Sequence, residues 1–370
     1  MRRWQYFALS VLLLLPVYWQ PRVQADDLSR HLDNAWLPQF IESGHAQGMV
    51  MLRQTTNLLF DLLLNGLFRV FGAELAQRLA VSLAVMVFVW GAFRFVSVAG
   101  GAPAWHLLPC LAMLAYGWVF HMGFFNFYLG MGLCFWALAA AWEWRPRRAW
   151  WTVPLLALAY LAHALPVVWT LALLLYQWLA RRMSPQSRIY ITAGWLAGLV
   201  ILQLAIGRLF FAKWSPAQIK MVTGADQVWV FDTKYYAILI GLLLLWSLLF
   251  LDLLKNTGAR GVMFSVPFQF CVISAAAVLI LPATVLLPGS RHTLVYIAER
   301  MSLGVGVCVC ALLAAARPHN LQRYAMGLVA FLFFAFLYRD EKLSNALSTR
   351  IDGVISRLPH RPVPGGVENQ

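Results

Sequence analysis

Charged residues are scarce in this sequence: Asp, Glu, Lys and Arg make up 12% of 370 residues, whereas hydrophobic residues make up 61%. A typical soluble domain is about half apolar and about a quarter charged, so this composition excludes an ordinary soluble domain. Cysteine is also rare. The five cysteines lie inside apolar runs without neighbouring metal-ligand residues, and we interpret them as small buried hydrophobic side chains.

The catalytic signatures of soluble enzymes are missing as well. The sequence contains no phosphate-binding glycine loop, no nucleophile elbow and no zinc-binding histidine pair. None of its apolar segments carries a repeated stripe of polar or charged residues, which argues against a channel. The apolar segments also lack the two-residue alternation of a membrane barrel.

Apolar segments of roughly 20 residues are what the sequence has in abundance, and that is the length a helix needs to cross a bilayer. Helices also satisfy their own backbone groups where no water is present. We therefore expect an all-α fold: a polytopic membrane helix bundle of about 11 transmembrane helices forming one domain over residues 1–338. Residues 339–370 are expected to be a short C-terminal tail, partly disordered. The expected spans are 4–20, 76–95, 104–119, 124–142, 149–162, 165–180, 189–207, 236–253, 263–286, 301–316 and 324–338.

The distribution of basic residues predicts the orientation of these spans. With the N-terminus in the cytoplasm, the cytoplasmic connections hold 13 basic residues and two acids, and the other side holds 16 basic residues and 13 acids. Short loops rich in Lys and Arg stay cytoplasmic, so the C-terminus is expected on the periplasmic side. The net charge of +14 is then explained by topology and by contact with membrane lipids, and we expect no nucleic-acid partner.

Two regions leave the topology open. Residues 149–180 are too many for one straight span; a break at "AHALP" (162–166) predicts two short helices, whereas a single kinked helix would invert every later span. The N-terminal segment either remains as the first span or is a signal peptide cleaved after Ala25.

Ionisable residues gather in "VQADDLSRHLDNAWLPQF" (23–40), directly after the first apolar run. Asp27 and His31 are four residues apart and therefore share one face of a helix that starts near Asp26. A carboxylate beside an imidazole forms a general base with an orienting partner, or half of a divalent-metal site. The alternative is that Asp26 and Asp27 cap the N-terminus of the helix.

The same outer loop, residues 21–75, contains an amphipathic segment, "RQTTNLLFDLLLNGLFRVFG" (53–72). Its polar residues recur at every fourth position and form one helical stripe, opposite leucines and phenylalanines. This pattern predicts a helix that lies in the membrane interface or packs on the bundle, or simply a surface helix with a solvated face. The stripe consists of Asn57, Asp61, Asn65 and Arg69.

Three further polar positions fall on the same expected side of the membrane. Asn126 lies among aromatic residues in "HMGFFNFYLGMG" (121–132), whose glycines allow close helix packing. His163 lies in the break "AHALP", where an ionisable group needs a partner or a cavity. Glu299 and Arg300 precede a late span and either pair with each other, anchor the interface or bind phosphate.

The order of these motifs resembles that of bacterial multi-pass membrane proteins of the GT-C glycosyltransferase type, over roughly residues 1–320. The resemblance is carried by an Asp-x-x-x-His element, an amphipathic helix, a Phe-x-Asn-Phe entrance to a span, a histidine in a short apolar pair and an acid–arginine step. In this sequence they read Asp27-Leu28-Ser29-Arg30-His31, "QTTNLLFDLLLNGLFRVFGAELAQRLAVSL", "FFNFYLGMGL", "LAHALPVVW" and "ERMSLG".

This resemblance implies an enzyme of the bacterial inner membrane that transfers a sugar from a polyprenyl-phosphate donor to an envelope glycan or lipid at the periplasmic face. Asp27 would act as the base or as a carboxylate ligand of Mg²⁺ or Mn²⁺, with Asp26 as its neighbour and His31 as an orienting or acceptor-contacting group. Arg300 would face the donor phosphate. The other expected substrate-binding residues are Asn57, Asp61, Asn126, His163 and Glu299.

Two other functions are compatible with the sequence. The chain could be a non-enzymatic partner of other envelope-glycan assembly proteins, or a transporter or flippase of a lipid-linked solute. A transporter is expected to contain inverted repeats, and the sequence has no convincing one.

Overall fold

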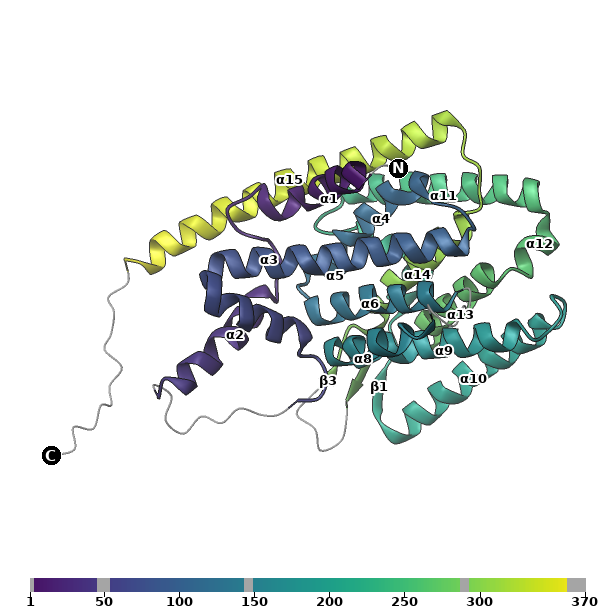
Figure 1. Cartoon of the computed structure of the whole chain (residues 1–370), viewed down its shortest axis with the longest axis horizontal. Coiled ribbons are helices and arrows are strands. Elements are labelled where there is room, and N and C mark those ends of the chain that lie inside the picture. Colours follow the sequence, from purple (N-terminus) through teal and green to yellow (C-terminus); the bar gives the residue numbers. More distant parts are fainter. Residues whose placement is uncertain (1–2, 45–53, 143–148, 287–292, 358–370) are drawn as a thin grey trace.

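The computed structural model describes residues 3–44, 54–142, 149–286 and 293–357 (Figure 1). The expected all-α fold is confirmed over these residues, with one addition, a small antiparallel sheet in the order β1-β2-β3. The strands are β1 (Phe211–Lys213), β2 (Thr284–Leu286) and β3 (Thr293–Leu294). The helices of the first half are α1 (Arg3–Tyr18), α2 (Leu28–Glu42), α3 (Leu59–Ala99), η1 (Trp105–Leu107), α4 (Leu108–Ala115), α5 (Trp118–His121), α6 (Phe125–Ala141), α8 (Thr152–Ala162) and α9 (Ala164–Ala180).

The second half of the chain is equally helical. Two short 3₁₀ helices, η2 and η3, precede α11 in the loop that follows β1. The helices are α10 (Arg188–Leu209), η2 (Pro216–Met221), η3 (Ala225–Val228), α11 (Tyr235–Thr257), α12 (Ala259–Met263), α13 (Val266–Ile280), α14 (Ile297–Leu313) and α15 (Asn320–Ile355).

Four of the described helices, α3, α10, α11 and α15, are long and apolar enough to cross a membrane. The remaining expected spans coincide with shorter helices, so the fold supports a helical membrane protein without establishing 11 crossings. The expected span 104–119 is divided into η1, α4 and α5, because the chain turns at Tyr116 and Gly117.

Helix α3 combines two expected elements. The amphipathic segment and the expected span 76–95 together make up its 41 residues, but they are two helices that meet at a kink at Gly72, whose φ and ψ are not helical. Gly72 has φ +75° and ψ 172°, a conformation that is essentially restricted to glycine. The kink directs the first part of α3 toward α2 and leaves the second part inside the bundle (Figure 1).

The break at "AHALP" is confirmed. Helix α8 ends at Ala162, His163 has an extended backbone with φ −166° and ψ 130°, and α9 starts at Ala164. The C-terminus differs from the expectation: α15 continues through residue 338 to Ile355, so the expected tail begins as helix. Residues 358–370 of that tail lie outside the described residues, as do Arg2 and the cluster Arg145, Arg147 and Arg148 used in the charge count.

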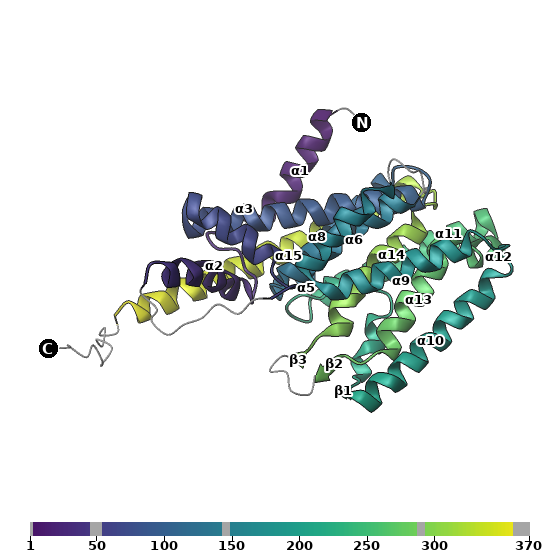
Figure 2. The ribbon, with the colours of Figure 1, turned by 60° about the horizontal axis from the view of Figure 1, so that its bottom comes forward.

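The long helices run side by side, with α3 against α6, α6 against α8 and α13 against α14. Glycines permit the closest approach, since a Cβ on Gly91 would lie 2.6 Å from the Gly132 carbonyl oxygen. Helix α1 packs on the bundle through one face, where Trp90 Nε1 donates to Ser10 Oγ and Leu13 and Val17 are buried. Helix α10 lies at the outer edge of the bundle and has no buried residue (Figure 2). In a membrane, these two helices would present apolar side chains to lipid.

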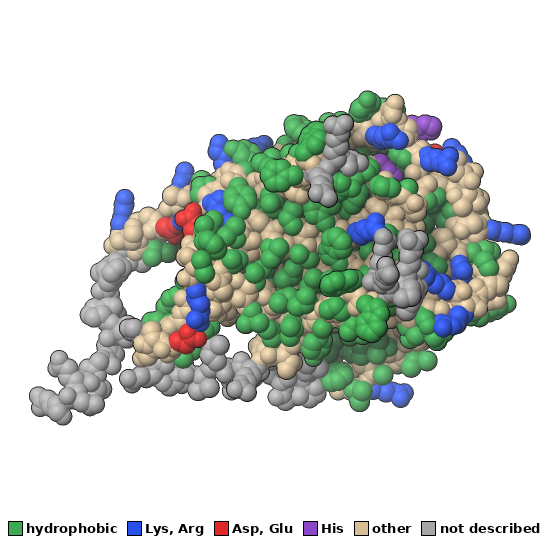
Figure 3. All heavy atoms as spheres, viewed as in Figure 1, with side chains coloured by type: hydrophobic (Ala, Val, Ile, Leu, Met, Phe, Trp, Pro, Cys, Tyr) green, Lys and Arg blue, Asp and Glu red, His purple; other side chains and the backbone are tan. Residues whose placement is uncertain are grey.

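Polar and apolar side chains are segregated along the bundle. Hydrophobic side chains cover the middle of the face seen in Figure 3, while Lys and Arg side chains gather toward its ends. The connections that follow α9 and α11 lie at one end, and α2 lies at the other (Figure 1). The elements that carry Asp27 and Asp61 therefore lie away from the Arg181 and Arg260 connections.

Candidate functional site

One small cavity gathers residues that are far apart in the sequence. Its volume is about 70 Å³, and it lies between the start of α2, the segment before α3, the start of α6, the α8–α9 break and the start of α14. Six residues proposed from the sequence line it, together with two phenylalanines. The lining residues are Asp27, His31, Asn57, Asn126, His163, Arg300, Phe124 and Phe127.

Asp27 occupies the N-cap position of α2, but its side chain makes no capping hydrogen bond. The carboxylate instead lies 3.3 Å from Arg30, with 29% of the side chain exposed. Its backbone N–H donates to the carbonyl of Met122 at 3.2 Å, which fixes the start of α2 against the turn before α6. Simple helix capping therefore does not account for this carboxylate.

The carboxylate that pairs with His31 is Asp61 rather than Asp27. His31 Nδ1 lies 2.7 Å from Asp61 Oδ1, and His31 Nε2 lies 3.1 Å from the carbonyl oxygen of Gly123. The expected helical pair of Asp27 and His31 is thus corrected: both line the cavity, but the ring is oriented by α3. The buried ring is thus held between the Asp61 carboxylate and the Gly123 carbonyl oxygen.

Asn126 joins this network from α6. Its Nδ2 donates to Asp61 Oδ2 at 2.6 Å and to the carbonyl of Asn57 at 3.2 Å. Its Oδ1 accepts from the backbone N–H of Phe60 at 2.7 Å, which caps the N-terminus of α3 from outside the helix. Asn126 is 2% exposed, so these bonds hold Asn57, whose φ is +60°, at the wall of the cavity.

The polar stripe of the amphipathic segment lies partly against α2 and partly at the surface. Asn65 Nδ2 donates to the carbonyl of Ala35 at 2.9 Å, and Arg69 pairs with Glu42 at 2.9 Å. Together with Asp61, these residues dock the first part of α3 on α2. Helix packing is therefore observed at Asp61 and Asn65, whereas Asn57 and Arg69 are exposed.

His163 lies on the opposite wall of the cavity from α2. Its Nδ1 accepts from the backbone N–H of Leu165 at 3.2 Å, so the hydrogen of the neutral ring is on Nε2. Burial lowers the pKa of His163 to about 4, and the Arg300 guanidinium acts in the same direction. The ring is therefore neutral at physiological pH.

Arg300 faces the same nitrogen, with Nη1 3.5 Å from His163 Nε2. The Arg300 guanidinium and the His163 Nε2–H are then both hydrogen-bond donors. Two donors this close are favourable when a hydrogen-bond acceptor binds to both of them. The guanidinium stacks 3.8 Å above the ring of Phe124, and its buried Nε has no hydrogen-bond partner. Burial lowers the pKa of Arg300 to about 10 and the Asp27 carboxylate opposes that shift, so the side chain stays cationic. Among the described residues no carboxylate forms an ion pair with it.

Asp26 and Glu299, both proposed from the sequence, do not line this cavity. Asp26 is exposed and faces a larger neighbouring cavity, while its backbone N–H donates to the carbonyl of His121 at 2.8 Å. Burial raises the pKa of Glu299, whose Oε2 is buried without a partner. Its carbonyl accepts from Gln227 at 2.8 Å, so Glu299 belongs to the packing of α14 on η3.

The donors around the cavity do not suit a protein-held divalent metal. No group of three or more His, Cys, Asp and Glu side chains comes together in the described ranges. Among the described residues that line the cavity, Asp27 supplies the single carboxylate; Asp61 is not among them and is engaged by His31 and Asn126. The cationic Arg300 lines the same cavity.

Sequence reasoning did not assign the contacts of two further residues, Gly123 and Asp226. Gly123 has φ +74°, and a Cβ there would lie 2.5 Å from the backbone nitrogen of Asp27, so only glycine lets this turn support Asp27. Asp226 in η3 accepts from Ser302 Oγ at 2.7 Å, and burial raises its pKa to about 7. A glycine among aromatics and an acid in an aromatic loop were visible in the sequence, but their contacts depend on tertiary packing.

Comparison with known proteins adds no relative: no family model matches the chain, and no curated protein and no solved structure is significantly similar to it.

Proposed function

We propose that this chain is a membrane glycosyltransferase that moves a sugar from a polyprenyl-phosphate donor to a hydroxyl of an envelope glycan or lipid. The reaction takes place at the periplasmic face of the bacterial inner membrane, with the N-terminus in the cytoplasm. The observation that supports this most directly is the presence of the Asp27 carboxylate and the Arg300 guanidinium in one cavity. A base and a cation are the two groups that this transfer needs.

In the proposed reaction, Asp27 accepts the proton of the acceptor hydroxyl. The hydroxyl oxygen forms a bond to the anomeric carbon of the sugar as the bond from that carbon to the donor phosphate breaks. The leaving polyprenyl phosphate keeps the electron pair, and Arg300 stabilises the charge that develops on its oxygens. The guanidinium offers a fork of N–H groups that matches phosphate geometry.

His163 completes the phosphate side of the cavity. Because Nδ1 is occupied by Leu165, the Nε2–H is directed at the space beside Arg300. A phosphate oxygen between the two donors would satisfy both of them. This arrangement favours a sugar donor with an anionic phosphate at Arg300 over a neutral sugar donor.

Asp61, His31 and Asn126 act as positioning residues. Their mutual hydrogen bonds fix the start of α2 relative to α3 and α6, and Asp27 is located by that junction. They are satisfied by one another, so they hold the geometry and do not take the proton.

The test is sugar transfer from labelled polyprenyl-phosphate sugar by the purified full-length chain in membranes. We expect Asp27→Asn to lower kcat by about 100-fold or more, as for loss of a general base, with little change in donor KM. Arg300→Lys keeps the positive charge but loses the paired N–H groups of the guanidinium, and should raise the KM for the sugar donor about tenfold or more.

Asp33→Asn serves as the matched control, since Asp33 is an exposed carboxylate on the same helix. Its transfer rate should stay within about twofold of the wild type. Transfer by Asp27→Asn at the wild-type rate, or equal losses in Asp27→Asn and Asp33→Asn, would contradict the proposed role of Asp27.

A further inference from the structure

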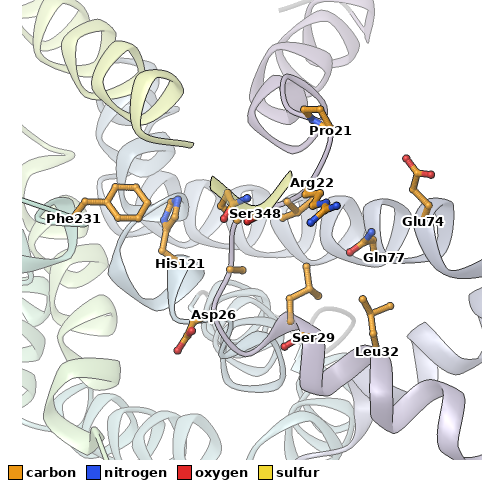
Figure 4. Close-up of a pocket in the computed structure, with 14 residues that line it drawn as sticks. Pro21, Arg22, Asp26, Ser29, Leu32, Glu74, Gln77, His121, Phe231 and Ser348 are labelled. Atoms are coloured by element: carbon orange, nitrogen blue, oxygen red, sulfur yellow. The ribbon is translucent and has the colours of Figure 1, made fainter. Parts of the chain in front are cut away.

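A second, larger cavity adjoins the segment that carries Asp27. Its volume is about 810 Å³, within the range of small-molecule sites. Figure 4 shows its walls: Ser29 and Leu32 come from α2, Glu74 and Gln77 from α3, and Ser348 from α15. Asp26 lines this cavity and Asp27 lines the smaller one, so consecutive residues face two cavities.

The larger cavity differs in charge from the one that contains Arg300. Its lining includes two carboxylates, Asp26 and Glu74, but Glu74 is 81% exposed and lies 3.8 Å from Arg78. The one arginine among the lining residues, Arg22, is paired with Asp352, so the described lining offers no unpaired arginine or lysine to an anionic group. Within the described part of the chain, the side chains of Ser29 and Gln77 have no hydrogen-bond partner and are free to bind a ligand. Asp26 has no partner either, but its carboxylate points away from these two side chains (Figure 4).

An aromatic wall closes the side opposite Glu74 and Gln77 (Figure 4). His121 is fixed there, with Nε2 3.2 Å from Glu341 Oε1 and Nδ1 3.2 Å from the carbonyl oxygen of Gly117. The ring of Phe231 packs against His121 at 5.1 Å between centroids, and 43% of Phe231 is exposed. The cavity thus combines a held aromatic surface with free carboxylate, hydroxyl and amide groups.

We propose that this cavity binds the neutral carbohydrate part of the acceptor. Carboxylate and amide oxygens accept hydrogen bonds from sugar hydroxyls, the amide N–H₂ and the serine hydroxyl donate to them, and the exposed ring covers the apolar face of a pyranose. The charges of the two cavities then indicate which ligand each one binds. The phosphate of the sugar donor binds at Arg300, and the uncharged carbohydrate of the acceptor binds in the cavity that Asp26 lines. This assignment rests on the function proposed above.

Binding is measured by saturation-transfer NMR on the full-length chain in nanodiscs, with the methyl α-glycosides of glucose, galactose and mannose as neutral probes and N-acetylneuraminic acid as the anionic probe. We expect a saturation-transfer signal from at least one neutral glycoside and no signal from the anion. Phe231→Ala and Gln77→Ala should each weaken that signal by about fivefold. Arg300→Gln, in the other cavity, should leave it unchanged.

The outcomes separate this inference from the proposed function. One outcome is that the chain binds glycosides through Phe231 and Gln77 but transfers no sugar. This outcome supports the binding site and contradicts the proposed glycosyltransferase activity. Sugar transfer with an acceptor KM unaffected by Phe231→Ala and Gln77→Ala supports the enzyme and overturns the binding site. The absence of signal from every neutral glycoside, or a signal lost only in Arg300→Gln, also overturns it.

Discussion

At the scale of single residues, Asp61 connects three helices, because its carboxylate from α3 accepts from His31 of α2 and from Asn126 of α6. Asp61→Ala removes the acceptor of His31 Nδ1 and one of the two acceptors of Asn126 Nδ2. We expect it to lower the free energy of unfolding by about 2–3 kcal/mol, measured by denaturation in mixed micelles. Asp33→Ala removes an exposed carboxylate of α2 and should change the free energy of unfolding by less than about 0.5 kcal/mol. Equal effects would show that the Asp61 network does not hold the helices together.

Gly123 offers a sharper test of how Asp27 is positioned. Alanine at 123 combines a strained φ of +74° with a Cβ 2.5 Å from the Asp27 nitrogen, whereas alanine at 101 has the strain, at φ +76°, and no atom within 4 Å. The strain costs about 1–3 kcal/mol at either position. We expect Gly123→Ala to be the more destabilising and to abolish sugar transfer, while Gly101→Ala keeps transfer. Full transfer by Gly123→Ala would rule out this role of the turn.

His163 predicts a pH dependence of stability. Its pKa is lowered from 6.5 to about 4 in the folded chain, so above pH 6.5 the ring is neutral in both states and contributes no pH dependence. As the pH falls from 6.5 toward 4, only the unfolded chain binds the proton, and stability is lost. The loss is at most about 1.4 kcal/mol per pH unit. In thermal unfolding, the wild type should lose more stability on acidification than His163→Asn; parallel curves would contradict the burial of a neutral ring.

The sequence predicted which residues line this cavity better than it predicted their hydrogen-bond partners. The i, i+4 spacing of Asp27 and His31 reports only on one helix, and it suggested that they interact with each other. The actual partner of His31 lies 30 residues away, and the contact of Arg300 with His163 spans 137 residues. Such pairs are decided by how helices pack, which a single sequence does not specify.

At the scale of elements, Gly72 separates the part of α3 that docks on α2 from the part inside the bundle. Its φ and ψ are strained for any other residue, so Gly72→Ala should cost about 1–3 kcal/mol and weaken docking of the first part. Gly66→Ala in the same helix has open space and helical geometry, and should stabilise by about 0.5–1 kcal/mol. Denaturation and limited proteolysis near residue 72 measure both changes. Stabilisation by Gly72→Ala would mean that the kink is not required.

Helix breaks were predicted well where a strong signal stands in the sequence, and poorly elsewhere. Pro166 and the polar His163 revealed the α8–α9 break, which the structure contains. The boundary between the amphipathic segment, expected to end at residue 72, and the span expected from residue 76 is also present, because the non-helical Gly72 separates two helices within α3. The extension of α15 past residue 338 was missed: its charged residues suggested a tail, but Glu341 and Asn345 are buried against neighbouring elements.

At the scale of the whole molecule, the account requires that residues from distant parts of the chain open to one compartment. The count of basic residues predicts that side to be the periplasm, and the fold places α2 at the end away from the α9–α10 and α11–α12 connections (Figure 1). The described cysteines are mostly buried, so single introduced cysteines should react selectively.

The most direct measurement is therefore labelling with a membrane-impermeant thiol reagent. Single cysteines are placed at Asp27 and Asn57 in the cavity, at the exposed Tyr296, which precedes α14 and packs against Phe124, and at Arg182 and Arg260 at the opposite end. We predict that reagent added from the periplasm labels positions 27, 57 and 296 and does not label 182 and 260. Labelling of positions 27 and 296 from opposite sides of the membrane would contradict the account, since Asp27 and Arg300 could not then share a cavity.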